Sequence, residues 1–88
     1  MNAKLSPVIQ KEILDLNKKN PKLVAKIQKQ IALFEENPKH PSLRTHKLSG
    51  NLDNMWSISI NMSIRMIYVK IDETSVLFVR IGKHDEIY

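Results

Sequence analysis

Few side chains in this 88-residue chain can move a proton near neutral pH, because it has three histidines and no cysteine. His46 and His84 stand in short polar segments, and imidazole acts as acid or base with little retuning. Arg65 opens an apolar run, where an unpaired guanidinium is costly to bury, so we expect it at a sheet rim or beside a dedicated partner. The alternative to a functional role is a structural salt bridge from Arg65 to Asp53 or Asp85. Tyr88 adds a phenol that can donate a proton or stack on a planar ring. These groups would suit acid–base chemistry beside a cation.

Composition indicates one domain, residues 1–88, with a single core. The lack of cysteine excludes a disulfide scaffold, a thiolate zinc site and a cysteine nucleophile. The sequence has no cluster of acidic residues and no paired histidines at ligand spacing, so we expect no metal and no cofactor. Its apolar stretches are too short to cross a bilayer, and the N-terminal segment lacks a signal-peptide core, so we expect a cytoplasmic protein.

The net charge of +5 is unevenly distributed. Residues 1–50 hold ten basic and four acidic side chains, a balance of +6, whereas residues 51–88 hold four basic and five acidic, a balance of −1. Such a basic excess favours a nucleic acid or an acidic protein as partner. Lys22, Lys26 and Lys29 recur at helical spacing, and we interpret them as a solvated helix face rather than a track for RNA.

The first half of the chain predicts two consecutive helices. Ser6-Pro7 combines an N-cap with a proline at the first helical position, and Asn20-Pro21 repeats the signal, so residues 18–20 form the expected connection. The second helix should stop by Asn37-Pro38. Apolar side chains recur at helical spacing at Ile9, Ile13 and Leu16, then at Leu23, Ile27, Ile31 and Phe34.

The second half predicts strands joined by tight turns. Residues 40–50 are expected to form a loop, and residues 56–61 then alternate between apolar and polar side chains, with Trp56 on the core side. Two further strands are expected, and the short connections require antiparallel pairing. We predict an α+β fold with two helices on one face of a small, mainly antiparallel, curved sheet. The further strands are residues 64–71 and 75–81, the connections are 61–63 and 72–74, and a short edge strand is possible at 3–5.

Four segments, in this order, carry a resemblance to a known family: His46-Lys47-Leu48-Ser49-Gly50, Trp56, residues 64–68 and residues 81–88. From about Pro7 to Tyr88, the chain resembles the RelE/ParE superfamily of bacterial toxins, and within it the RelE and YafQ branches. This resemblance implies an endoribonuclease that cleaves messenger RNA in the ribosomal A site. The ribose 2′-hydroxyl attacks the neighbouring phosphate and no metal is needed.

The resemblance also implies roles for individual residues. Arg65 matches an arginine that contacts the scissile phosphate, His84 and His46 match two histidines of YafQ-type toxins, and Tyr88 matches an aromatic residue that closes the active region. These four are the candidate catalytic residues. Candidate contacts to the RNA backbone are Lys47, Arg80 and Lys83.

The strand that begins at Trp56 departs from the family pattern. RelE-type toxins place lysines there and YafQ-type toxins a histidine, whereas this chain has Ser57 and Ser59. Serine cannot serve as a base at neutral pH, so the general base is left open between His46 and His84. The alternatives are a ParE-type DNA gyrase inhibitor and a non-catalytic module that only binds an antitoxin. All three hypotheses predict a cognate antitoxin as partner, and an acidic one would suit the charge of this chain. The endoribonuclease hypothesis adds mRNA and the ribosome as partners. We expect no membrane partner and a monomeric free toxin.

Overall fold

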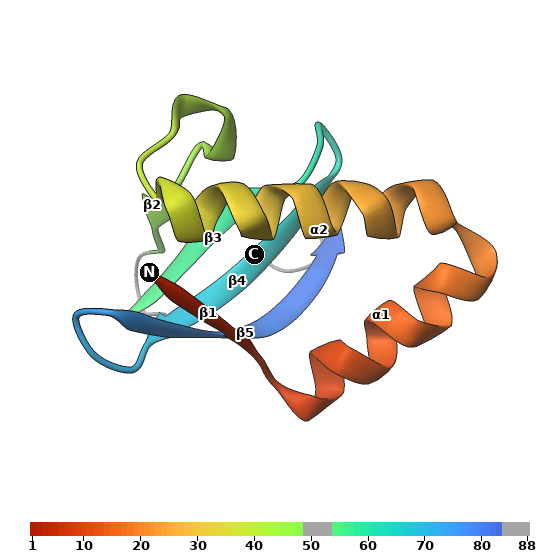
Figure 1. Ribbon diagram of the computed structural model, residues 1–88, viewed down its shortest axis with the longest axis horizontal. Coiled ribbons are helices and arrows are strands. Elements are labelled where there is room, and N and C mark those ends of the chain that lie inside the picture. The colour runs from red at the N-terminus through yellow and green to blue at the C-terminus, as the bar shows by residue number, and fades with distance from the viewer. Residues whose placement is uncertain (49–53, 84–88) are drawn as a thin grey trace.

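Two helices cover one face of a five-stranded sheet in the computed structural model, which describes residues 1–48 and 54–83 (Figure 1). The predicted α+β class is confirmed. No helix in this described part is long and apolar enough to cross a membrane. In chain order the elements are β1 (Asn2–Leu5), α1 (Pro7–Lys19), α2 (Pro21–Glu36), the 3-10 turn η1 (Pro41–Leu43), β2 (His46–Lys47), β3 (Met55–Ser59), β4 (Ile64–Lys70) and β5 (Ser75–Lys83).

The two helices meet at a single residue, Asn20. Its backbone N–H ends α1 by donating to the carbonyl of Leu16 at 2.6 Å, and its side chain starts α2 by accepting from the N–H of Leu23 at 3.1 Å. The prediction of a three-residue connection at 18–20 was therefore wrong, since Lys18 and Lys19 belong to α1. One residue suffices because an asparagine can satisfy the end of one helix and the beginning of the next.

The sheet has the order β1-β5-β4-β3-β2, and every neighbouring pair except β1 with β5 is antiparallel. The predicted edge strand is confirmed; it begins at Asn2 and pairs parallel to β5. Two side chains occupy its outer edge: the Glu35 carboxylate accepts from the N–H of Ala3 at 3.0 Å, and Gln10 Nε2 donates to the carbonyl of Leu5 at 2.8 Å. These contacts cover the edge against pairing with another strand.

The segment before β3 is more ordered than the predicted loop. His40 caps η1, because its Nδ1 accepts from the N–H of Ser42 at 3.1 Å. Arg44 follows with a left-handed backbone, φ 46°, and turns the chain into β2. His46 then lies opposite Ser57 on β3. A two-residue strand was missed because it shows no alternation in the sequence.

Three aromatic rings form the centre of the core between the helices and the sheet. The centroid of Phe34 lies 5.1 Å from that of Tyr68 and 5.6 Å from that of Phe78, while Tyr68 and Phe78 are 5.4 Å apart. Trp56 packs against this core and is partly buried, as predicted. The Lys70 ammonium lies 4.4 Å from the centroid of the indole ring. The core therefore ties α2 to β4 and β5, which position the site described below.

Tyr68 makes the stability of this core sensitive to alkaline pH. Burial raises the pKa of its phenol above the usual value. The folded protein thus favours the neutral phenol, and stability is complete below the pKa of an unfolded tyrosine and decreases as pH rises beyond it. We expect the free energy of unfolding, measured by urea denaturation, to fall less between pH 8 and pH 11 in Tyr68→Phe than in the wild type. An equal fall in both proteins would contradict this assignment.

Candidate functional site

The sheet face opposite the two helices, hereafter the far face, carries several of the candidate site residues. Met66 and Tyr68 point into the helix-covered core, so the alternate residues Arg65 and Ile67 project from the far face. Ile67 forms a second, smaller apolar cluster there with Leu48, against which Met55 and Val79 pack. The far face therefore has an apolar patch, and Arg65 stands two residues before that patch on β4.

Arg65 lies between two small residues. It pairs with Ser59 on β3 and with Gly82 on β5, so neither neighbouring strand places a bulky side chain beside the guanidinium. Its Nη1 atom is buried and has no hydrogen-bond partner among the residues that the structure describes. Such a group costs free energy until an acceptor reaches it. Asp53 and Asp85, the two candidate partners for a structural ion pair with Arg65, lie outside the described residues.

His46 shares the far face with Arg65. Its Nδ1 is 3.5 Å from the Ser57 hydroxyl and 3.5 Å from the carbonyl oxygen of Arg44. Ser57 pairs with Ile67, so His46 and Arg65 are separated by two strand spacings, about 10 Å, and by two residues along the strand, about 7 Å. The β3 side chains between them, Ser57 and Ser59, are small and buried.

A β-bulge brings Arg80 to the same face. Ile67 pairs with Arg80 but the next residue, Tyr68, pairs with Phe78, so Val79 is the extra residue of β5. Val79 packs on Ile67, and Arg80 is opposite Ile67, so both side chains lie on the far face. Strict alternation would have separated them. The bulge thus adds a second arginine, an exposed one, to the face that holds Arg65.

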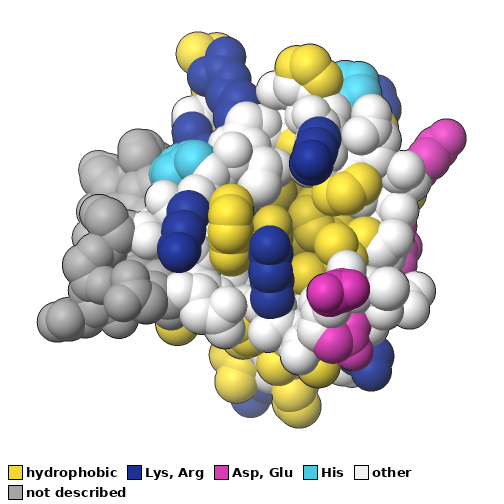
Figure 2. Space-filling model, turned by 90° about the vertical axis from the view of Figure 1, so that its left-hand side faces the viewer, with side chains coloured by type: hydrophobic (Ala, Val, Ile, Leu, Met, Phe, Trp, Pro, Cys, Tyr) yellow, Lys and Arg dark blue, Asp and Glu magenta, His cyan; other side chains and the backbone are white. Residues whose placement is uncertain are grey.

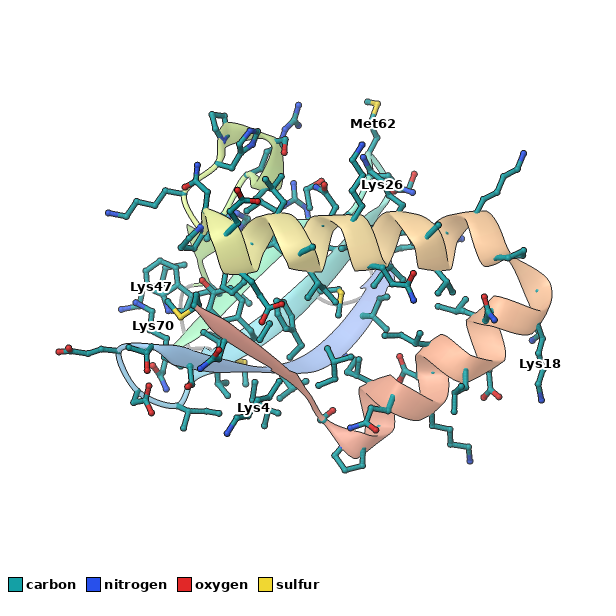
Figure 3. All side chains as sticks on the ribbon, in the orientation of Figure 1. Lys4, Lys18, Lys26, Lys47, Met62 and Lys70 are labelled. Carbon is teal, nitrogen blue, oxygen red and sulfur yellow. The ribbon has the colours of Figure 1, made fainter. Side chains whose placement is uncertain are left out.

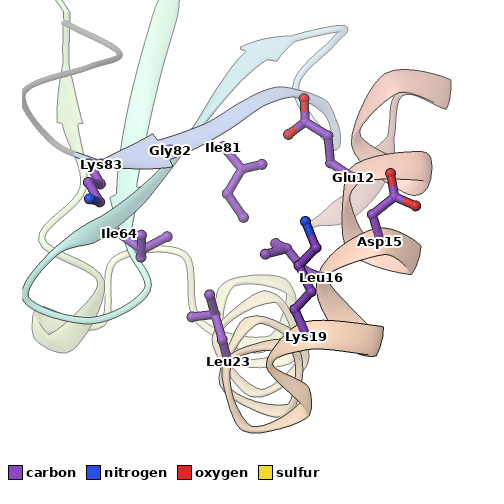
Figure 4. A pocket seen from close by; sticks show the side chains of 9 residues that line it. All are labelled: Glu12, Asp15, Leu16, Lys19, Leu23, Ile64, Ile81, Gly82 and Lys83. Atoms are coloured by element: carbon purple, nitrogen blue, oxygen red, sulfur yellow. The ribbon is translucent and has the colours of Figure 1, made fainter.

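Lys83 and Lys47 lie on the other side of the sheet. Lys83 is opposite Ile64, and it lines a cavity of about 330 Å³ between α1 and the sheet, together with Glu12 and Asp15 (Figure 4). Lys47 is opposite Trp56 on β3. Figure 2 shows the left-hand end of the molecule in Figure 1, where basic and acidic side chains both border a hydrophobic patch. The structure therefore groups His46, Arg65 and Arg80, but not the two lysines.

Two of the predicted catalytic residues, His84 and Tyr88, lie outside the described residues. Within residues 1–48 and 54–83, no three histidine, aspartate or glutamate side chains form a group that could hold a metal ion.

Sequence reasoning missed Gln30, which is 3% exposed and donates from Nε2 to the carbonyl of Ser59 at 3.0 Å. A signal was available, because Gln30 falls between Ile27 and Phe34 on the apolar stripe of α2. It also missed Lys26 and Arg44, which line a pocket with Arg65. No pattern in the sequence distinguishes Lys26 from the other lysines of α2.

The comparisons with known proteins identify the family and the fold. The profile of the family described as the bacterial toxin of type II toxin–antitoxin system, YafQ, matches residues 1–88. YafQ from E. coli strain BL21(DE3) is 19% identical, with a TM-score of 0.76 over 99% of this chain and 97% of that one. The YoeB–YefM complex from Staphylococcus aureus contains a chain that is 24% identical, with a TM-score of 0.76 over 96% of this chain and 97% of that one. The E. coli DinJ–YafQ toxin–antitoxin complex contains a chain that is 20% identical, with a TM-score of 0.74 over 99% of this chain and 96% of that one.

At these identities the solved structures establish the fold, whereas the profile match over the whole chain establishes the family. No curated protein matches the chain. The resemblance predicted from His46 to Gly50 and from residues 64–68 is confirmed at the level of the family. The chain therefore belongs to the YafQ family of bacterial toxins of type II toxin–antitoxin systems.

Proposed function

We propose that this toxin is an endoribonuclease that cleaves messenger RNA in the ribosomal A site. The ribose 2′-hydroxyl attacks the neighbouring phosphate, so the reaction needs no metal. One observation supports the proposal: the buried Nη1 of Arg65 has no hydrogen-bond partner among the described residues, and Arg65 shares its sheet face with His46 and Arg80. A cation with spare donors beside an imidazole suits a reaction in which charge develops on a phosphorane.

Each side chain takes a distinct part in this reaction. Arg65 stabilises the negative charge that develops on the phosphorane. His46, the described imidazole on the far face, removes the proton of the 2′-hydroxyl, and His84 donates a proton to the departing 5′-oxygen. Tyr88 stacks on the displaced base. Requirement for the 2′-hydroxyl makes RNA the substrate and excludes DNA.

The remaining basic residues hold the RNA rather than react with it. Arg80, exposed on the far face next to Ile67, contacts a backbone phosphate. Lys47 and Lys83 project from the other side of the sheet. From there they act through the positive field of the chain, which attracts messenger and ribosomal RNA over about a Debye length.

The partner that controls the toxin is a cognate antitoxin. Two of the similar structures are toxin–antitoxin complexes, YoeB–YefM and DinJ–YafQ. This chain carries a net charge of +5, so we expect an acidic antitoxin segment that covers the far face and keeps RNA away. We further propose that the toxin is cytoplasmic and that the free chain is a monomer. Light scattering on the purified chain would check the monomeric state.

The experiment that tests the function is controlled expression of the toxin with mapping of mRNA 5′ ends. We expect cuts at A-site codons of a translated message and none in the same message without a start codon. Co-expression of the antitoxin should remove both the cuts and the growth arrest. Growth arrest with intact messages would favour a gyrase inhibitor, and no arrest would favour a chain that only binds antitoxin; either result would overturn the proposal.

A further inference from the structure

A pocket of about 330 Å³ lies at the edge of β3, beyond the point where β2 ends. We call it the edge pocket; Lys26, Arg44, Ser59, Asn61 and Arg65 are among its lining residues. Ile60 donates its N–H to Ile64 on β4, so the neighbouring peptide carbonyl of Ser59 points away from β4, toward this open edge, and accepts from Gln30. The pocket is therefore built from α2, η1 and both strands of the β3–β4 hairpin.

The charges around the edge pocket have one sign. Lys26 comes from α2, Arg44 from the end of η1, and Arg65 from β4, and no acidic side chain is among the described residues that line it. Figure 3 shows Lys26 rising beside Met62 of the β3–β4 turn at this edge of the molecule. Three cations gathered from three elements repel one another unless an anion lies between them. The charge pattern thus favours an anionic ligand.

The hydrogen-bonding groups of the edge pocket are mainly donors. Arg65 Nη1 is buried without a partner among the described residues. The side-chain oxygen of Asn61 accepts from the N–H groups of Ser63 and Ile64, both at 2.8 Å, which leaves its amide nitrogen as the end to offer a ligand. A compact anion with several acceptor oxygens fits these donors, and phosphate is the biological anion with that chemistry.

We propose that the edge pocket binds a phosphate group through Arg65, Lys26 and Arg44. The phosphate can belong to an RNA backbone or to a free phosphate compound. Binding of an RNA phosphate rests on the proposed function, because Arg65 belongs both to the edge pocket and to the proposed catalytic site. Binding of a free phosphate compound does not depend on that function. In the RNA case the edge pocket holds a phosphate next to the scissile one and fixes the register of the message on the far face.

Binding measurements on the full chain test the proposal. The probes are inorganic phosphate and a short RNA with 2′-O-methyl groups, which cannot be cleaved by 2′-hydroxyl attack. Lys26→Ala removes one pocket charge, and Arg44→Asn removes another while keeping a residue that tolerates a left-handed backbone. The matched control is Lys29→Ala, because Lys29 is exposed on the same helix and does not line the edge pocket.

We expect each pocket variant to weaken phosphate binding about tenfold, the effect of losing one charge-assisted hydrogen bond, and the control to change it less than about twofold. For the RNA, each pocket variant should also lower the slope of log affinity against log salt by about one. Weakening of both probes assigns the pocket to an RNA phosphate, and weakening of inorganic phosphate alone assigns it to a free phosphate compound. If the pocket variants behave as Lys29→Ala does with both probes, the proposal is wrong.

Discussion

Arg65→Ala is expected to slow message cleavage by about 10²–10³-fold while leaving the fold intact, which is the usual effect of removing one transition-state donor. Arg65 is flanked by Ser59 and Gly82, and no other described side chain on the far face can take its place at that point of β4. The rate is measured as cleavage of a translated message in a reconstituted translation reaction. Thermal unfolding of the same variant measures its stability.

The stability measurement separates catalysis from structure. Because Nη1 is buried without a described partner, the alanine variant should unfold at the same temperature as the wild type or at a higher one. A lower melting temperature would mean instead that Arg65 forms a structural ion pair, and the catalytic assignment would fail. Arg65→Lys keeps the charge but loses the two-pronged guanidinium, so it should recover only part of the rate. Arg80→Ala, the control on the same face, should have a smaller effect.

Phe34→Ala is expected to reduce the free energy of unfolding by about 3–5 kcal/mol, the range for deleting a buried aromatic side chain. Phe34 is 0% exposed and meets both Tyr68 and Phe78, so its loss opens a cavity and removes two aromatic contacts. A small domain has a total stability of about 5–15 kcal/mol, so the variant should be close to unfolded at growth temperature. Urea denaturation followed by circular dichroism gives the value.

The matched control for Phe34 is Leu14→Ala on α1. Leu14 is 67% exposed, so shortening it should change the free energy of unfolding by less than about 0.5 kcal/mol. A Phe34→Ala variant that loses no more stability than Leu14→Ala would show that the aromatic cluster is not the centre of the core.

The sequence was sufficient for the parts of the fold with strong local signals. Ser6-Pro7 and Asn20-Pro21 marked both helix starts, and alternation along β3 and the apolar run of β4 marked two strands. These signals depend on neighbouring residues alone. Two-residue β2 and the parallel pairing of β1 depend on contacts between distant segments, which no local pattern records.

The site was predictable only in part for the same reason. Arg65 was singled out because a charged residue in an apolar strand is conspicuous. The far-face position of Arg80 was not predictable, since it follows from one extra residue in β5. Likewise, Lys26 and Lys29 look alike in the sequence, and only the β3–β4 hairpin beside α2 distinguishes them. The roles of His84 and Tyr88 stay predictions.

The pairing of β1 with β5 has a consequence during synthesis. Residues 2–5 have their partners at residues 75–78, so β1 cannot join the sheet until nearly the whole described chain has left the ribosome. Arg65 also lacks one of its two flanking strands until Gly82 has been added. A nascent chain therefore has no complete far face before residue 82 has been added. The topology therefore postpones completion of the far face until translation of the described chain is almost finished.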